Sequence, residues 1–149
     1  MSQLNGFFAL RTPEDLLGKL EADFDRLCAA NPTTVDAQYA AFDFFVTAEH
    51  LPDWVSYARG GSKTQHREYP DGALVSHVAN GAKHFRVDHP RHTTVRDTRF
   101  EPGVFDPNVF DPLVFDVLRL VLDLEDGTSI EVHEVAKRVV DHWRSVLRP

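Results

Sequence analysis

The stretch SHVANGAKHF, residues 76–85, concentrates side chains that could take part in a reaction. Its candidate residues are His77, Asn80, Lys83 and His84. Positions three, four and seven apart share one face of a helix, so His77, Asn80 and His84 would point the same way. Two imidazoles can accept and donate protons near neutral pH, while a cation can stabilise a developing anion. The same face would equally serve recognition, or hold histidines that are satisfied by structural hydrogen bonds.

A second polar group precedes this stretch, in the segment FFVTAEHLPDW. Glu49 and Asp53 are four residues apart, and therefore on one side of a helix, with His50 beside them. If the two helices lie antiparallel, these side chains and the histidines could meet in a cleft. We interpret Glu49, His50 and Asp53, together with Arg86, as candidate substrate- or partner-binding residues.

Histidine and carboxylate side chains also bind metals, so a metal-binding helical protein is one alternative. Helical bundles that hold two metal ions use Glu-x-x-His on paired helices, and neither segment contains it. Glu49 and His50 are adjacent, and adjacent residues on a helix point about 100° apart. Cys28 is the only cysteine, which excludes an intramolecular disulfide and a thiolate cluster. The sequence therefore predicts no metal site and no cofactor.

The charge distribution limits the partners. A formal net charge of -7 argues against a general electrostatic grip on nucleic acid. The segment from Arg86 to Arg99 is a local exception, because four arginines and two histidines stand there against two aspartates. It is either a solvated loop or a small phosphate-facing patch. No apolar run of about 18 residues is present, so we expect a cytoplasmic protein without a membrane partner.

Three segments have the apolar spacing of the helices that must position these residues. They are about 13–30, a segment that begins near Thr34 and carries VDAQYAAFDFFVTAEHLPDWVSYA, and about 71–85. Thr12 and Asp15 form a capping-box pattern before the first helix. Pro52 should kink or end the second, because proline lacks a backbone donor and disfavours helical geometry in the preceding residue. Asp71 could cap the third. The side of the third helix that should face a core consists of Leu74, Val75, Val78, Ala82 and Phe85. Residues 59–72 are predicted to form a loop.

The last third of the chain changes character. The sequence VFDPNVFDPLVFDV repeats Phe-Asp-Pro-x-Val, and its prolines forbid a regular helix. We predict an extended segment, at about 100–116, whose aromatic residues anchor it to the domain surface; a carboxylate ladder for a cation is the alternative. Alternating leucines at 118–124, an Asp126-Gly127 turn, and Ile130 and Val132 after it predict a β-hairpin. A closing helix follows, with Val135, Val139, Trp143 and Val146 on one stripe.

These elements predict one α+β domain of 149 residues that is predominantly α. A domain of this length buries roughly 68–70% of its unfolded surface, which is enough for a core without disulfides. Its expected parts are an antiparallel helical bundle at about 13–88, the extended Phe-Asp-Pro segment at about 100–116, and the hairpin with the closing C-terminal helix at about 117–149.

The motif ANGAKHF, preceded by FFVTAEHLPDW, resembles the HEPN domains of bacterial toxin and antiphage systems over about Val35 to Phe85. Most of the chain is also similar to a set of uncharacterised bacterial proteins, which brings no function. The HEPN resemblance implies a metal-independent ribonuclease site made of an arginine, a polar residue, three further residues and a histidine. Asn80 and His84 match this motif, but Ala79 stands where the arginine belongs. The resemblance therefore implies a non-catalytic site, unless Lys83 supplies the cation.

From these observations we expect a bacterial binding or regulatory module with a degenerate HEPN-like helical core. The alternatives are a ribonuclease that uses His84 and His77, with Asn80 and Lys83, and a metal-binding helical protein. The HEPN resemblance and the aromatic residues at positions 7, 8, 105, 110 and 115 favour a homodimer. The further partner would be a protein or an RNA.

Overall fold

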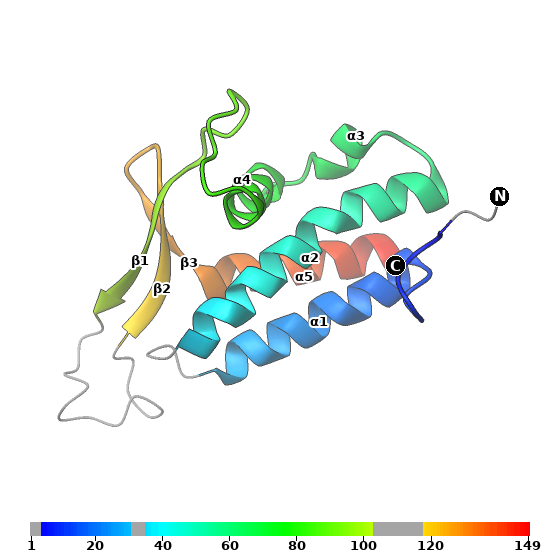
Figure 1. Ribbon diagram of the computed structural model, residues 1–149, viewed down its shortest axis with the longest axis horizontal. Coiled ribbons are helices and arrows are strands. Elements are labelled where there is room, and N and C mark those ends of the chain that lie inside the picture. The colour runs from blue at the N-terminus through cyan, green and yellow to red at the C-terminus, as the bar shows by residue number, and fades with distance from the viewer. Residues whose placement is uncertain (1–3, 31–34, 103–117) are drawn as a thin grey trace.

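The protein has an α+β fold in which helices predominate, as the sequence predicts. The computed structural model describes residues 4–30, 35–102 and 118–149. In chain order its elements are α1 (Pro13–Ala29), α2 (Val35–Arg59), α3 (Lys63–Arg67), α4 (Gly72–Lys83), β1 (Val95–Pro102), β2 (Leu118–Leu124), β3 (Ser129–Glu131) and α5 (Val132–Leu147). Figure 1 shows α1 lying antiparallel to α2 and α5, with the sheet at one end of these helices.

The start of α1 has the predicted capping box. The Thr12 hydroxyl accepts the Asp15 backbone N–H at 3.1 Å, and the Asp15 carboxylate accepts the Thr12 N–H at 2.9 Å. A cap of this kind contributes about 1 kcal/mol. It fixes the first turn of a helix whose apolar stripe, including Leu17 and Leu20, is buried in the core.

α2 continues through Pro52 to Arg59, so the expectation that the helix could end at Pro52 is wrong. The proline removes one backbone donor. However, Leu51 and Val55, on either side of it, are buried in the core. Tertiary packing supplies most of the stability of a helix within a protein, and these contacts sustain α2 beyond the proline.

Residues 59–72, expected to form a loop, contain the short helix α3. The Ser62 hydroxyl caps it by accepting the Gln65 backbone N–H at 3.0 Å. α4 begins at Gly72, where a Cβ atom would lie only 1.9 Å from the Arg67 carbonyl oxygen. Glycine at this position therefore lets the end of α3 approach the start of α4.

Asp71 precedes α4 at the predicted cap position, but its carboxylate makes no capping hydrogen bond. It instead accepts two hydrogen bonds from Arg138 of α5, from Nη2 at 2.7 Å and from Nε at 3.1 Å. This two-point ion pair joins the beginning of α4 to α5. α4 ends at Lys83. Phe85, predicted to face the core, lies beyond the helix and is fully exposed, so that expectation is wrong.

The predicted hairpin is present as β2 and β3, and Gly127 has the positive φ of 87° that suits its turn. It belongs to a three-stranded antiparallel sheet in the order β1-β2-β3. The strand β1 was not predicted. It pairs along β2, with Thr98 opposite Leu122 and Phe100 opposite Leu120.

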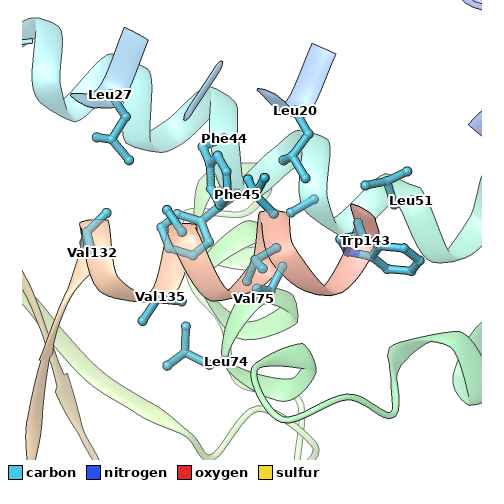
Figure 2. Packing of buried hydrophobic residues seen from close by; sticks show 14 of the residues in the cluster. Leu20, Leu27, Phe44, Phe45, Leu51, Leu74, Val75, Val132, Val135 and Trp143 are labelled. Carbon is cyan, nitrogen blue, oxygen red and sulfur yellow. The ribbon is translucent and has the colours of Figure 1, made fainter. Parts of the chain in front are cut away.

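α5 closes the core as predicted. Val135, Val139 and Trp143 are buried, and Val146 packs partly against them. Figure 2 shows Trp143 and Val135 among buried residues of α1, α2 and α4. Val132, expected in the strand, is instead the first residue of α5.

The Phe-Asp-Pro segment, with Phe105, Phe110 and Phe115 and the aspartates that follow each of them, lies outside the described residues. In the described ranges, none of the helices has the length and apolar character needed to cross a membrane.

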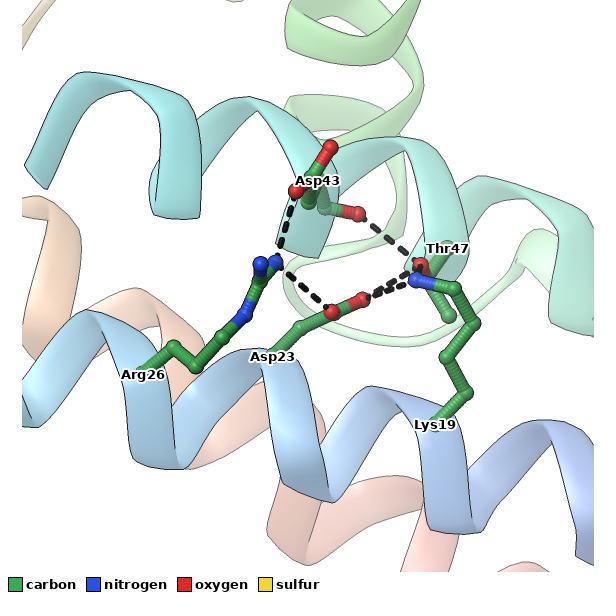
Figure 3. Close-up of polar contacts among 5 residues, drawn as sticks. All are labelled: Lys19, Asp23, Arg26, Asp43 and Thr47. Atoms are coloured by element: carbon green, nitrogen blue, oxygen red, sulfur yellow. Dashed lines mark hydrogen bonds and ion pairs between the residues drawn. The ribbon is translucent and has the colours of Figure 1, made fainter. Parts of the chain in front are cut away.

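A polar cluster around the buried Asp23 and Thr47 side chains joins α1 to α2 (Figure 3). Asp23, which is 3% exposed, accepts hydrogen bonds from Lys19 at 2.7 Å, Thr47 at 2.6 Å and Arg26 at 3.1 Å. Arg26 also binds Asp43 at 2.6 Å. The charges at this interface are therefore matched by partners that come from both helices.

Candidate functional site

A groove of about 580 Å³ lies between α2, α4 and the sheet. We call it the α2–α4–sheet groove. Its apolar walls include Phe45 of α2, Val78 of α4 and Leu122 of β2. Three aromatic side chains on its lining are exposed, namely Phe42 at 50%, Phe85 at 109% and Phe100 at 38%. Such exposure is unusual for phenylalanine and makes the groove a candidate binding surface.

His77 lines this groove from α4. Its Nδ1 accepts two backbone hydrogen bonds, from Thr94 N–H at 3.3 Å and from Val95 N–H at 3.0 Å. Burial lowers the pKa of His77 below its ordinary value, although the Glu125 carboxylate acts in the opposite direction. A nitrogen that accepts two N–H groups carries no proton, so His77 is neutral here, with its hydrogen on Nε2. It holds the start of β1 against α4.

The other predicted residues of SHVANGAKHF lie apart from that contact. The Asn80 amide donates to the Ser76 carbonyl oxygen at 2.7 Å, within the same helix. Lys83 ends α4, and His84 follows it as the C-cap residue, with its backbone N–H bonded to the Asn80 carbonyl. Lys83 and His84 are both exposed. Of the two predicted catalytic histidines, only His77 lies among the groove-lining residues.

The predicted carboxylates of α2 bind an arginine that the sequence analysis did not single out. Glu49 Oε1 accepts hydrogen bonds from Arg67 Nε at 3.0 Å and from Ser76 Oγ at 3.1 Å. Asp53 Oδ1 accepts a further bond from Arg67 Nη2 at 3.3 Å. Glu49 and Asp53 thus tie α2 to α3 and α4. No local sequence signal marks Arg67, because its partners lie 14 and 18 residues away.

His50 faces a different hollow from His77. It lines a smaller groove of about 320 Å³ together with Phe7, Lys19, Thr47 and Trp54. The two histidines therefore line separate grooves. Arg86, the remaining predicted binding residue, pairs with Asp88 at 3.4 Å, and both side chains are more than 70% exposed. An ion pair with that exposure contributes little to stability.

Metal-ligand geometry is not formed by the histidines. Among the residues that the structure describes, no three His, Cys, Asp or Glu side chains are grouped so as to hold a metal ion.

Some cations near the groove form no ion pair with a described carboxylate. Most of the 16 Lys and Arg side chains form an ion pair with a carboxylate. Lys83, Arg91 and Arg96 form none with any carboxylate in the described ranges. Arg96 lines the groove, and the Arg91 guanidinium donates to His92, whose ring centroid lies 5.3 Å from that of His77. Arg96 is therefore a groove-lining cation without an ion pair to a described carboxylate, whereas Arg99, also on the lining, pairs with Asp123 at 2.7 Å.

Comparison with known proteins adds no assignment. No protein-family model matches the chain, and searches of curated proteins and of solved structures gave no significant match.

Proposed function

We propose that this protein is a cytoplasmic binding or regulatory module that captures single-stranded RNA in the α2–α4–sheet groove. The observation that carries the proposal is the set of cations Lys83, Arg91 and Arg96, which are not used in ion pairs with described carboxylates. Cations beside exposed aromatic rings are the combination that binds single strands, because the cations neutralise phosphates and the rings stack on bases.

The distribution of charge supports the same proposal. Residues 83–99 contain five Lys or Arg and two Asp, a formal charge of +3. Because the whole chain carries -7, the remaining residues carry -10. A basic segment in an otherwise acidic molecule disfavours general attachment to nucleic acid and attracts a polyanion to the side of the molecule that carries the segment. Phe42, Phe85 and Phe100 line the groove on which this segment borders.

We favour binding over cleavage, in a module with a degenerate HEPN-like core. Ala79, at the position of the arginine in the motif, is 4% exposed and faces away from solvent. His77 Nδ1 already accepts two backbone hydrogen bonds and is therefore not free to accept a proton from a substrate. Cleavage through a ribose hydroxyl needs an acceptor, a donor and a fixed cation at one place. Lys83 and His84 are exposed at the end of α4, so the ribonuclease alternative depends on substrate bringing them together with His77.

The test is fluorescence anisotropy with a short labelled single-stranded RNA at several salt concentrations. We expect the triple variant Lys83→Gln, Arg91→Gln, Arg96→Gln to bind more weakly. The slope of the logarithm of its binding constant against the logarithm of salt concentration should fall in magnitude by about 2, because each phosphate contact to a single strand contributes about 0.7. Arg11→Gln is the matched control, because the Arg11 guanidinium forms no ion pair with a described carboxylate, donates to the Asn5 carbonyl oxygen and lies at the N-terminal end; the backbone N–H of Arg11 that binds Asp15 is kept in the variant.

Equal binding by wild type, triple variant and control would overturn the proposal. A Phe85→Ala variant that binds as wild type, while Tyr57→Ala does too, would remove the aromatic part of it; Tyr57 is 78% exposed and lies outside the groove lining. RNA cleavage that is lost in His84→Ala would promote the ribonuclease alternative instead. Competition by a polyglutamate peptide as strong as that by RNA would favour an acidic protein partner.

We also propose a homodimer. Phe7 and Phe8 are 65% and 79% exposed, and their rings contact each other edge to face at 4.7 Å. A second copy would cover this apolar surface. Light scattering at micromolar concentration should give twice the chain mass of 16.9 kDa, and a particle of the single mass would refute the dimer.

A further inference from the structure

Three histidines meet where α4, β1 and the residues that join them come together. The ring centroid of His92 lies 5.3 Å from that of His77 and 6.0 Å from that of His89. The three residues come from different parts of the chain. His77 belongs to α4, whereas His89 and His92 lie between α4 and β1. We call this group the histidine cluster.

Each ring of the cluster accepts a hydrogen bond at a nitrogen that must therefore be unprotonated. His77 Nδ1 accepts the Thr94 and Val95 backbone N–H groups. His92 Nε2 accepts Arg91 Nε at 3.2 Å, and His89 Nδ1 accepts the Arg91 backbone N–H at 3.3 Å. A proton on any of these nitrogens would point at an N–H donor instead of accepting it. His77 and His92 are therefore neutral in this arrangement.

The surroundings of the cluster oppose protonation. Burial is the main reason that the pKa of His77 and the pKa of His92 lie below the ordinary value of 6.5, and for His92 the Arg91, His77 and His89 charges act in the same direction. Glu125, from the turn between β2 and β3, favours the protonated form of His77. β1 adds Arg96 and Asp97 to the groove lining beside His77, and these are opposite in sign.

We propose that the histidine cluster is a pH-sensitive latch on the α4–β1 edge of the groove. With neutral rings, the latch holds residues 89–95 against α4. Protonation of His77 and His92 removes the acceptors of Thr94, Val95 and the Arg91 guanidinium, so this edge opens, and it adds up to two positive charges beside Arg91 and Arg96. The consequence for binding rests on the proposed function: an open, more positive edge binds single-stranded RNA more tightly at mildly acidic pH.

The direction of the pH effect follows from proton linkage. The closed latch binds fewer protons than the open one, because the pKa of His77 and the pKa of His92 lie below the ordinary value of 6.5 in the closed state. Closure is therefore complete above pH 6.5 and is lost as the pH falls through the lower pKa values of the closed state. Each ring that must release a proton to close contributes up to about a tenfold change in the open-to-closed ratio per pH unit.

The experiment follows amide hydrogen exchange in the free full-length protein, expressed as protection factors so that the intrinsic pH dependence cancels. Between about pH 7.5 and pH 5, Thr94 and Val95 should lose protection by up to about tenfold per pH unit once His77 titrates. Amides in the middle of α1 and α5 should stay protected, which checks the fold. His77→Phe keeps a ring without the acceptor, so Thr94 and Val95 should be unprotected at every pH. His84→Phe is the control, because His84 is exposed and makes no side-chain hydrogen bond within the described ranges.

The latch is overturned if Thr94 and Val95 keep their protection while the His77 ring protonates, or if His77→Phe leaves their protection and its pH dependence unchanged. It is also overturned if the His77 pKa, measured by NMR, lies at or above 6.5. These readouts need no ligand, so they separate the latch from the proposed function. A latch that opens in a protein that binds no RNA refutes only the proposed function, and RNA binding without a change at Thr94 and Val95 refutes only the latch.

Discussion

The two sides of α2 differ in how they use the same kinds of side chain. On the side of α1, Phe44 is fully buried, and Asp43 and Thr47 belong to a network that matches the charges of both helices. On the side of the groove, Phe42 is half exposed and Gln38 and Ala41 line an open surface. One helix thus serves as a core element and as the wall of a candidate binding site.

The charged side chains on the two sides of α2 also differ, because those on the α1 side form ion pairs within the fold and some of those near the groove do not. Asp23 accepts hydrogen bonds from three donors, so the side chains of Lys19, Arg26 and Thr47 are engaged in the interface between α1 and α2. Arg91 and Arg96 have no described carboxylate partner. An unpaired exposed cation contributes almost nothing to stability, and its placement is therefore more informative about binding than that of a paired one.

The largest expected effect compares two phenylalanines on α2. Phe44→Ala should lower the free energy of unfolding by about 3–5 kcal/mol, because it leaves a cavity in the core. Phe42→Ala should change it by less than about 0.5 kcal/mol, since the ring is half exposed. Urea titrations followed by circular dichroism measure both. Equal losses of unfolding free energy in the two variants would show that the groove side of α2 is packed as tightly as the side facing α1.

A second prediction concerns the charges. Asp23→Ala should destabilise the protein by about 1–3 kcal/mol, because Thr47 and two cations lose a buried acceptor. The loss is limited because the Lys19 and Arg26 side chains are 43% and 57% exposed and can turn to water. The triple variant of Lys83, Arg91 and Arg96 to Gln should stay within about 0.5 kcal/mol of wild type. Thermal unfolding measures the stability of both variants. A triple variant that is less stable than Asp23→Ala would show that Lys83, Arg91 and Arg96 also stabilise the fold.

The smallest effect tests a paired charge on the groove side. The hydrogen bond from Arg99, at 2.7 Å, is the main reason that the pKa of Asp123 lies below its ordinary value of 3.8, with a second contribution from Ser129. The folded state therefore gains stability from this carboxylate above pH 3.8, and loses it as the pH falls through the lower folded pKa. The stability difference between wild type and Asp123→Asn should shrink in acid. A stability difference that is constant from neutral pH to about pH 2 would show that the ion pair between Arg99 and Asp123 does not stabilise the fold.

Much of the helical part of this fold could be predicted from local sequence. Leu16, Leu20 and Leu27 recur at helical spacing after a capping box, and the stripe of α5 that contains Val139 and Trp143 is equally regular. These signals are local, because helix periodicity and caps involve residues a few positions apart. The same holds for the hairpin, whose Asp126-Gly127 turn lies between two apolar runs.

The features that could not be predicted depend on distant partners. β1 has few apolar residues, chiefly Val95 and Phe100, and it is a strand because β2 pairs with it. His77 was placed on the polar face of its helix, but its two donors lie 17 and 18 residues further along the chain. Phe85 was assigned to the core on periodicity alone, and the end of α4 at Lys83 overturned that assignment. Tertiary contacts of this kind leave no spacing pattern in one sequence.

The junction of β3 and α5 has a mechanical consequence for the groove. β3 ends at Glu131 and α5 begins at Val132, so no linker separates the strand from the helix. Glu131 also binds Arg119 of β2 at 2.6 Å, while the far end of α5 is held to α1 by Arg144 and Arg148 on Glu21. A strand that passes directly into a helix held at both ends has little freedom to turn about the connection. We therefore expect the β3 side of the sheet to stay fixed to the helical core, and a change in the width of the groove to come from α4 and the residues that join it to β1.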